Sequence, residues 1–393
     1  MFIIAMLIAL FGSGFIGKSL VKKLVNYDFV DELVVVDKNQ EALDMVRKMI
    51  TSDKITFERQ DVSDIDIISK IISRMDLSIV ALPPSLVVLN VIKVCADMGC
   101  NYLDLGLGDY PLLEILKNED IFKNAGIAVF TGFGLAPGIT NIMVKHLSHR
   151  LDSIEEVKIR DGSLVNPGDS MFTFTYSPSI FLSDFTIKPL VYRDGEFKRV
   201  QPLSEEEDYE FPSPVGNLKV YLIDHEEVFS LPKYLGKEMK HLDYKLALTD
   251  ETYQVIKTLL RLGLLRDDYI EINGIKISPK SVLLELIFKS VNQRVLDGYE
   301  MLVVDIKGYR GGNKFRLKSY IYMTHKEAFE KYNENATSYL TSLLPLTIVE
   351  MLHKGEIEQT GLILPEMLNC EIMIQKLISK GLPYFEKEEP GLQ

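Results

Sequence analysis

Short apolar runs alternate with amphipathic segments from Met1 to about Arg150. The runs with the length and composition of buried strands are Ile3–Leu10, Glu32–Val36, Ile55–Glu58, Leu77–Leu82, Tyr102–Leu105 and Ile127–Thr131. Between the first two runs, Ile16, Leu20 and Leu24 recur at helical spacing. Near-continuous apolar strands separated by helices are typical of a parallel sheet covered on both faces. The pattern therefore predicts a doubly wound α/β domain over residues 1–145.

After Leu151 the pattern changes to more strictly alternating segments that are broken by turn residues. The predicted strands here include Glu156–Arg160, Met171–Tyr176, Leu218–Ile223, Glu300–Lys307 and Lys314–Met323. The pairs Asp161-Gly162 and Asp194-Gly195 and the turn Asn166-Pro-Gly168 favour hairpins. We therefore predict a second, α+β domain over residues 146–335, built on a largely antiparallel sheet. Helical patterns at Ala336–Leu352 and Glu366–Ser379 predict that residues 336–393 pack back on the first domain.

Composition excludes several classes of protein. The formal net charge of −12 over 393 residues argues against nucleic acid as a partner, because a phosphate backbone requires a basic surface. The apolar stretch Phe2–Phe11 has no basic segment before it and is too short to span a bilayer. The three cysteines form no CxxC pair, and the six histidines show no HxxxH spacing, so we expect no metal site. We expect a cytoplasmic protein that does not bind membranes.

A glycine-rich turn follows the first predicted strand directly and reads Gly12-Ser13-Gly14-Phe15-Ile16-Gly17. In a Rossmann domain the first glycine allows the tight turn, the second lets the backbone approach a pyrophosphate, and the third lets the helix pack on the sheet. Asp37 ends the second strand, where a carboxylate accepts hydrogen bonds from ribose hydroxyls and repels a 2′-phosphate. The motif predicts an NAD site, with NADP kept open by the neighbouring Lys38. The alternative is a connecting turn without a ligand.

Other polar or stiff residues stand where the next strands end. Asp61 and Val62 follow the third strand and are candidates to flank an adenine, although Asp61 would equally suit a helix N-cap. Leu82-Pro83-Pro84 ends the fourth strand and forms a rigid turn on the nicotinamide side. Asp104 ends the fifth strand, where open α/β sheets bind ligands, and is our candidate catalytic residue. Its alternative role is to cap a helix that starts near Asp109.

The second motif follows the sixth strand. It runs from Thr131 to Asn141 and includes Gly134, Ala136, Pro137, Gly138 and Asn141, which we predict to bind substrate. Pro137 suits the first position of a helix, and the exposed amides of such a helix would bind a carboxylate or the nicotinamide amide. The same residues would also make a stiff linker between a strand and a helix.

Taken together, the glycine turn, Leu82-Pro83-Pro84, Tyr102-Leu-Asp104 and Phe133–Asn141 resemble the saccharopine dehydrogenase family, most closely its lysine 6-dehydrogenase branch. The resemblance continues through Tyr176-Ser-Pro178 and to about residue 265. It implies a Rossmann domain, a domain for substrate binding and dimerisation, and a homodimer. It also implies that Tyr176 binds substrate and that a pyridine nucleotide oxidises a C–N bond in a lysine-related amino acid.

Two departures from the family pattern leave the substrate open. Ala136 stands where members that cleave saccharopine carry an acidic residue, and Leu246–Thr252 contains no arginine where the family often has one for a substrate carboxylate. The favoured interpretation is an NAD(P)-dependent oxidoreductase acting on the CH–NH bond of lysine or a saccharopine-type amino acid. One alternative is a polyamine reductase of the carboxynorspermidine type, which requires an acidic pocket. The other is an NAD-binding regulator without activity, which would explain the missing arginine.

Overall fold

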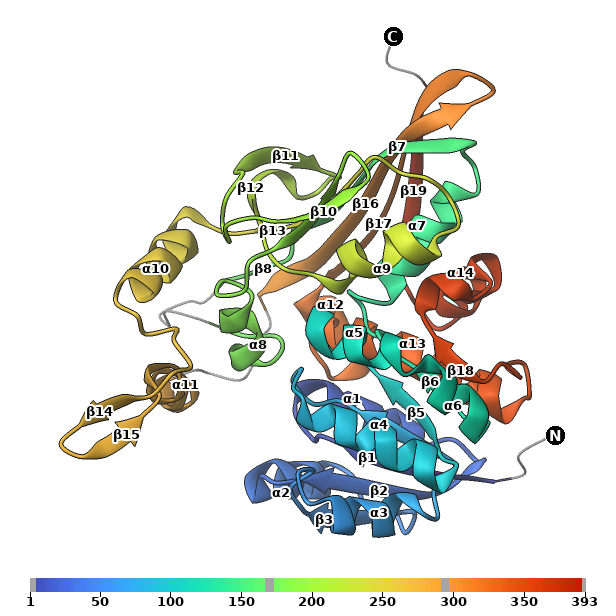
Figure 1. Cartoon of the computed structure of the whole chain (residues 1–393), viewed down its shortest axis with the longest axis vertical. Helices are drawn as coiled ribbons and strands as arrows, with labels where there is room; N and C mark the ends of the chain where they lie inside the picture. Colours follow the sequence, from blue (N-terminus) through green and yellow to red (C-terminus); the bar gives the residue numbers. More distant parts are fainter. Residues whose placement is uncertain (1–4, 167–172, 291–296, 391–393) are drawn as a thin grey trace. The chain divides into compact units, whose positions relative to one another are not determined.

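A computed structural model describes residues 5–166, 173–290 and 297–390 of the chain. The described chain forms two compact units (Figure 1). The first unit comprises Met1–Lys145 and Ser338–Leu382, and the second comprises His146–Thr337 and Pro383–Gln393. The chain therefore crosses between the units close to the position where its hydrophobic pattern changes.

The first unit is built on a seven-stranded parallel sheet in the order β18-β6-β5-β4-β1-β2-β3. Its strands are β1 (Met6–Phe11), β2 (Val30–Asp37), β3 (Ile55–Arg59), β4 (Leu77–Val80), β5 (Asn101–Asp104), β6 (Ala128–Phe130) and β18 (Gly361–Ile363). Its helices are α1 (Phe15–Leu24), α2 (Gln40–Met49), α3 (Ile65–Ile72), α4 (Val87–Met98), α5 (Asp109–Lys117), α6 (Glu119–Ala125), α13 (Ala336–His353) and α14 (Cys370–Ser379), with a 3₁₀ turn at Pro365–Met367. The helix α7 (Ile139–Ser148) leads from this unit into the second. The predicted parallel sheet is confirmed, although Ile3 and Ile4 of the first predicted strand lie outside the described residues.

The second unit contains a ten-stranded mixed sheet whose main path is β10-β9-β13-β7-β16-β17-β19. Its strands are β7 (Ser153–Asp161), β8 (Leu164–Val165), β9 (Leu190–Arg193), β10 (Glu196–Arg199), β11 (Glu207–Phe211), β12 (Gly216–Leu222), β13 (His241–Ala247), β16 (Gly298–Arg310), β17 (Asn313–Thr324) and β19 (Tyr384–Pro390). Its helices are α8 (Pro178–Ser183), α9 (Glu226–Tyr234), α10 (Asp250–Arg261), α11 (Pro279–Ser290) and α12 (His325–Tyr332). The strands β14 (Ile270–Ile272) and β15 (Ile275–Ile277) form a separate hairpin (Figure 1). Within the large sheet β13 and β7 run parallel and the other pairs are antiparallel, as the sequence predicted for most of it.

Two predicted elements of this region differ from the structure. The end of the chain does not belong entirely to the first unit, because Tyr384–Pro390 pairs with β17 as the edge strand β19. Of the predicted strand Met171–Tyr176, the first two residues lie outside the described residues, and Thr173–Tyr176 is irregular. This segment leads into α8, in whose first turn Pro178 is placed. Of the predicted turn at Asn166, Pro167 and Gly168 also lie outside the described residues.

A buried ion network fixes the strands around the end of β7. Arg160 is fully buried and donates to the Asp243 carboxylate at 2.6 Å and to the Glu207 carboxylate at 2.8 Å. Lys245 donates to the same Glu207 carboxylate at 2.9 Å. Charged groups in such a position must be paired, because an isolated buried charge is costly. The network therefore fixes β11 and β13 against β7. This strand ends at Asp161, directly after Arg160.

The helices in the described part of the chain include none with the length and apolar character needed to cross a membrane.

Candidate functional site

The glycine turn of the first unit has the geometry of a nucleotide cradle. Gly12 has a φ of +103°, and a Cβ there would lie 2.5 Å from the Ala81 carbonyl oxygen. A Cβ on Gly17 would lie 2.0 Å from the Gly12 carbonyl oxygen. Both positions therefore require glycine for the fold of the turn itself. Gly14 differs, because a Cβ there would meet nothing within 4 Å. The space above Gly14 is the approach that a pyrophosphate needs.

The start of α1 completes this cradle. Gly14 is the N-cap residue, no side chain caps the helix, and its first turn carries no acidic residue. The first amides of α1, beginning at Phe15 and Ile16, therefore remain available for an anion. A helix N-terminus also carries a partial positive charge that favours phosphate. The residues present thus fit a bound dinucleotide.

Ser13 and Asp37 are joined by hydrogen bonds at the ends of β1 and β2. Ser13 is buried, and both its amide and its hydroxyl donate to Asp37 Oδ2 at 2.8 Å. The Asn39 amide donates to Asp37 Oδ1 at 2.8 Å. Ser13 therefore positions the carboxylate of Asp37 beside the glycine turn. This is the location from which a carboxylate accepts hydrogen bonds from an adenosine ribose.

We expect Asp37→Asn to weaken the preference for NAD. Asparagine keeps an acceptor for Ser13 but removes the charge that repels a 2′-phosphate. The ratio of kcat/KM for NAD to that for NADP should fall about tenfold, which corresponds to about 1.4 kcal/mol. Steady-state kinetics with both nucleotides measure this ratio. An unchanged ratio would show that Asp37 does not face the ribose.

The other predicted cofactor residues lie at the same edge of the sheet. Asp61 accepts from the Ser63 amide at 2.9 Å, and hydrogen bonds from Ser63 lower the pKa of Asp61. The N-cap of α3 is Asp64, so the capping alternative for Asp61 is wrong. Val62 and Leu82 pack partly against the core of the unit, whereas Pro83 and Pro84 are exposed after β4. Their contact with a nucleotide stays a prediction.

Asp104 holds two strand ends together. It is 1% exposed, and its Oδ1 accepts from the amides of Gly106 at 2.8 Å and Gly132 at 2.9 Å. Burial raises the pKa of Asp104 to about 6. The helix α5 has Gly108 as its N-cap, so the capping alternative is wrong. These contacts give Asp104 a structural role, and its predicted catalytic role stays a prediction.

The loop after β6 is tightly closed. Gly138 has a φ of +127°, and a Cβ there would lie 2.2 Å from the Gly134 carbonyl oxygen. Asn141 accepts from the Gly138 amide at 2.9 Å and donates to Glu366 at 3.0 Å. The helix α7 starts at Ile139, so the expectation that Pro137 is its first residue is wrong. The close approach of Gly134 to Gly138 turns the chain before the helix begins. The Ala136–Pro137 peptide bond in this loop is cis.

The second unit contains a buried group of ionisable and aromatic side chains, here called the acidic cluster. Its members come from β7, the segments on either side of α8, α9 and its N-cap, β13 and β16. They are Asp161, Tyr176, Asp184, His225, Glu226, Glu227, Tyr244 and Glu300. Tyr176 was predicted from the family resemblance, whereas the other members were not predicted to form a site.

Two carboxyl groups of the acidic cluster share the residue Ser163. The Ser163 amide donates to Asp161 at 2.9 Å, and its hydroxyl donates to Glu300 at 3.0 Å. Glu300 is 5% exposed, and its second oxygen accepts from the Thr337 hydroxyl. Burial, with the nearby charge of Asp161, raises the pKa of Glu300 to about 8.

His225 contacts both an aromatic ring and a carboxylate of the acidic cluster. Its ring stacks on Tyr244 with centroids 3.7 Å apart, and its Nδ1 is 2.5 Å from the Glu227 carboxylate. Burial lowers the pKa of His225, but the charges of Glu227 and Asp184 outweigh burial and raise it to about 9. Burial raises the pKa of Asp184 to about 7. Among the side chains described here, the acidic cluster holds five carboxyl groups and one imidazolium.

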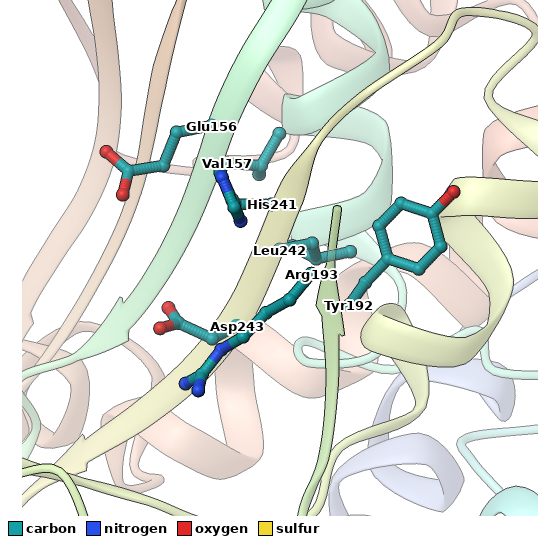
Figure 2. Close-up of a pocket in the computed structure, with 7 residues that line it drawn as sticks. All are labelled: Glu156, Val157, Tyr192, Arg193, His241, Leu242 and Asp243. Carbon is teal, nitrogen blue, oxygen red and sulfur yellow. The ribbon is translucent and has the colours of Figure 1, made fainter. Parts of the chain in front are cut away.

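Two hollows of the second unit lie outside the acidic cluster. The hollow in Figure 2, between Glu156, Arg193 and His241, has a volume of about 20 Å³, which is enough for a water molecule. A larger one of about 480 Å³ is lined by Lys188, Arg266 and Asp267 among others. Because its lining carries both charges, it does not favour a cationic ligand over an anionic one.

A parallel sheet with a glycine cradle and an acidic residue at the end of β2 is typical of NAD(P)-binding proteins. Sequence comparison agrees: residues 8–130 match the family model for the saccharopine dehydrogenase NADP-binding domain, and residues 134–382 match the model for the saccharopine dehydrogenase C-terminal domain. The chain therefore belongs to the saccharopine dehydrogenase family and binds a nicotinamide nucleotide.

Two curated proteins and one solved structure resemble the whole chain. The chain is 27% identical over 391 residues to the carboxyaminopropylagmatine dehydrogenase of Synechocystis, covering 95% of this chain and 96% of that protein. It is 23% identical to the carboxynorspermidine synthase of Vibrio alginolyticus, covering 97% of each. Among solved structures, the saccharopine dehydrogenase (L-Glu forming) of Saccharomyces cerevisiae matches with a TM-score of 0.74 at 18% identity, over 98% of this chain and all of that one. The last likeness shows a shared fold.

Proposed function

We propose that the protein is an NAD(P)-dependent oxidoreductase that acts on the CH–NH bond of an amino acid joined through its nitrogen to a cationic amine. The observation that carries this proposal is the acidic cluster. A buried group of carboxyls with one imidazolium favours a ligand that brings positive charge. An ammonium or guanidinium group meets this requirement, and the rings of Tyr176 and Tyr244 add faces that attract cations.

The relatives support this substrate class. The names of the two curated relatives contain agmatine and norspermidine, which are both cationic amines. Saccharopine itself carries several carboxylates, and the carboxyl groups of the acidic cluster would repel them. The absence of the family's arginine from Leu246–Thr252 also suits a substrate that is recognised mainly through positive charge. Lysine remains the second candidate, because its side chain ends in an ammonium group.

In this proposal the two units have separate tasks. The bound nicotinamide supplies hydride transfer to or from the carbon of the C–N bond. The glycine cradle and Asp37 hold the nucleotide through backbone amides and a carboxylate. The acidic cluster binds the charged tail of the substrate and so orients the C–N bond. His225 is protonated at neutral pH, and its Nδ1–H donates to the Glu227 carboxylate.

A substrate panel tests the proposal. Absorbance of the reduced nucleotide is followed with NAD or NADP against carboxyaminopropylagmatine, carboxynorspermidine, lysine and saccharopine. We expect kcat/KM for the adducts with cationic tails to exceed that for saccharopine by about 100-fold, or about 3 kcal/mol. Faster turnover of lysine or saccharopine would overturn the substrate class. Nucleotide binding without turnover of any of them would favour a regulator without activity.

A further inference from the structure

We propose that the Asp161–Glu300 carboxyl pair exchanges a proton for the positive charge of the substrate tail, so that tail binding releases a proton to solvent. The inference rests on the proposed function, because it concerns the same acidic cluster. It makes Asp161 and Glu300 the residues that select charged over neutral tails. No covalent step is involved: one carboxyl ionises, and the incoming ammonium or guanidinium group replaces its proton as the counter-charge.

The geometry that joins the two carboxyls is specific. Asp161 ends β7 and pairs with Leu302 of the neighbouring β16, two residues beyond Glu300. Ser163 binds both carboxyls, while Tyr244 donates to Asp161 Oδ2 at 3.3 Å. The Ser163 hydroxyl in turn accepts from the Met301 amide at 3.1 Å. These contacts hold the two carboxyls close together, where simultaneous ionisation is unfavourable.

The elements around this pair contribute further titratable groups. The α8 region contributes Tyr176 and Asp184, the start of α9 contributes His225, Glu226 and Glu227, and β13 contributes Tyr244. Tyr176 and Tyr244 stay neutral, because burial and the nearby carboxylates raise their pKa values further. The cation among these groups is His225, which is already engaged by Glu227. Burial raises the pKa of Asp184 to about 7 and that of Glu300 to about 8, so these two carboxyls carry protons near pH 7 until a cation binds.

The affinity for a cationic tail should depend on the protonation of Glu300. Burial and the charge of Asp161 raise the pKa of Glu300 to about 8, so this carboxyl is protonated at pH 7 without a ligand. A bound cation stabilises the ionised form and lowers that pKa, so the complex holds fewer protons than the free protein. Affinity should therefore rise with pH below about 8, by up to about tenfold per pH unit. Above that value the carboxyl is already ionised and affinity should level off.

Calorimetric titration of agmatine into the protein saturated with NAD⁺ tests the inference without any turnover. Titrations in two buffers with different ionisation enthalpies give the number of protons released. We expect about one proton at pH 7 and few at pH 9, where the guanidinium group is still charged. Agmatine that binds at pH 7 without releasing a proton would overturn the inference alone. Failure of agmatine to bind at any pH would overturn both the inference and the proposed tail-binding role.

Substitution of Glu300 tests whether the released proton comes from the Asp161–Glu300 pair. Glu300→Gln resembles the protonated carboxyl, so it should fold and bind NAD⁺ as the unsubstituted protein does. It should bind agmatine about tenfold more weakly at pH 8.5 and release about one proton fewer at pH 7. Glu210→Gln, which removes an exposed carboxyl from β11, is the matched control and should leave both quantities unchanged. Undiminished proton release in Glu300→Gln would overturn the assignment to this pair.

Discussion

Gly14→Ala is expected to abolish tight nucleotide binding while leaving the protein folded. The new methyl group meets no atom beyond its chain neighbours within 4 Å, and the φ of Gly14, −71°, lies outside the left-handed region that favours glycine. The methyl instead occupies the approach to the amides of α1. We expect NAD affinity to fall about 100-fold, or about 3 kcal/mol. Fluorescence titration with NADH measures the affinity, and thermal unfolding measures the fold.

Gly17→Ala is the informative comparison for that result. Its Cβ would lie 2.0 Å from the Gly12 carbonyl oxygen, so the turn itself must move. We expect this variant to lose both stability and nucleotide binding. If Gly14→Ala binds NADH like the unsubstituted protein, the nucleotide does not pass over Gly14, and the cradle is wrongly assigned.

Asp184→Asn is expected to raise KM for a substrate with a cationic tail and to leave the Kd for NADH unchanged. The Asp184 carboxylate receives a hydrogen bond from Tyr176 at 3.4 Å and lies within the acidic cluster. At pH 8.5 it is ionised, since burial raises its pKa only to about 7. Loss of one such charge should cost about 2 kcal/mol, or about 30-fold in kcat/KM. Steady-state kinetics at that pH provide the measurement.

The pH profile separates this role from a structural one. The difference between Asp184→Asn and the unsubstituted protein should shrink below pH 7, where the native carboxyl is itself protonated. A purely structural defect would instead persist at every pH. Glu210→Gln again serves as the control for a change in net charge. An equal effect of Asp184→Asn on a substrate with a neutral tail would contradict charge recognition.

Local patterns in the sequence were sufficient for most of the first unit. Buried parallel strands have near-continuous apolar runs, so β1 to β6 could be predicted from the order of apolar and polar residues along the chain. The seventh strand, Gly361–Ile363, lies between helical segments. Its three residues are too few to show a periodic pattern. The edge strand Tyr384–Pro390 is rich in charge and shows no alternation of apolar and polar residues. Its pairing with β17 depends on residues far away in the chain.

The sequence by itself determined the nucleotide half of the candidate site, because Gly12–Gly17 and Asp37 act through backbone conformation and position at a strand end, both of which are local. Only the tertiary structure revealed the acidic cluster, which we propose binds the amine. Asp161, His225 and Glu300 are far apart in sequence and have no shared spacing, and the folding of the second unit brings them together. Their pKa values depend on desolvation and on each other's charge, which arise only when the chain is folded.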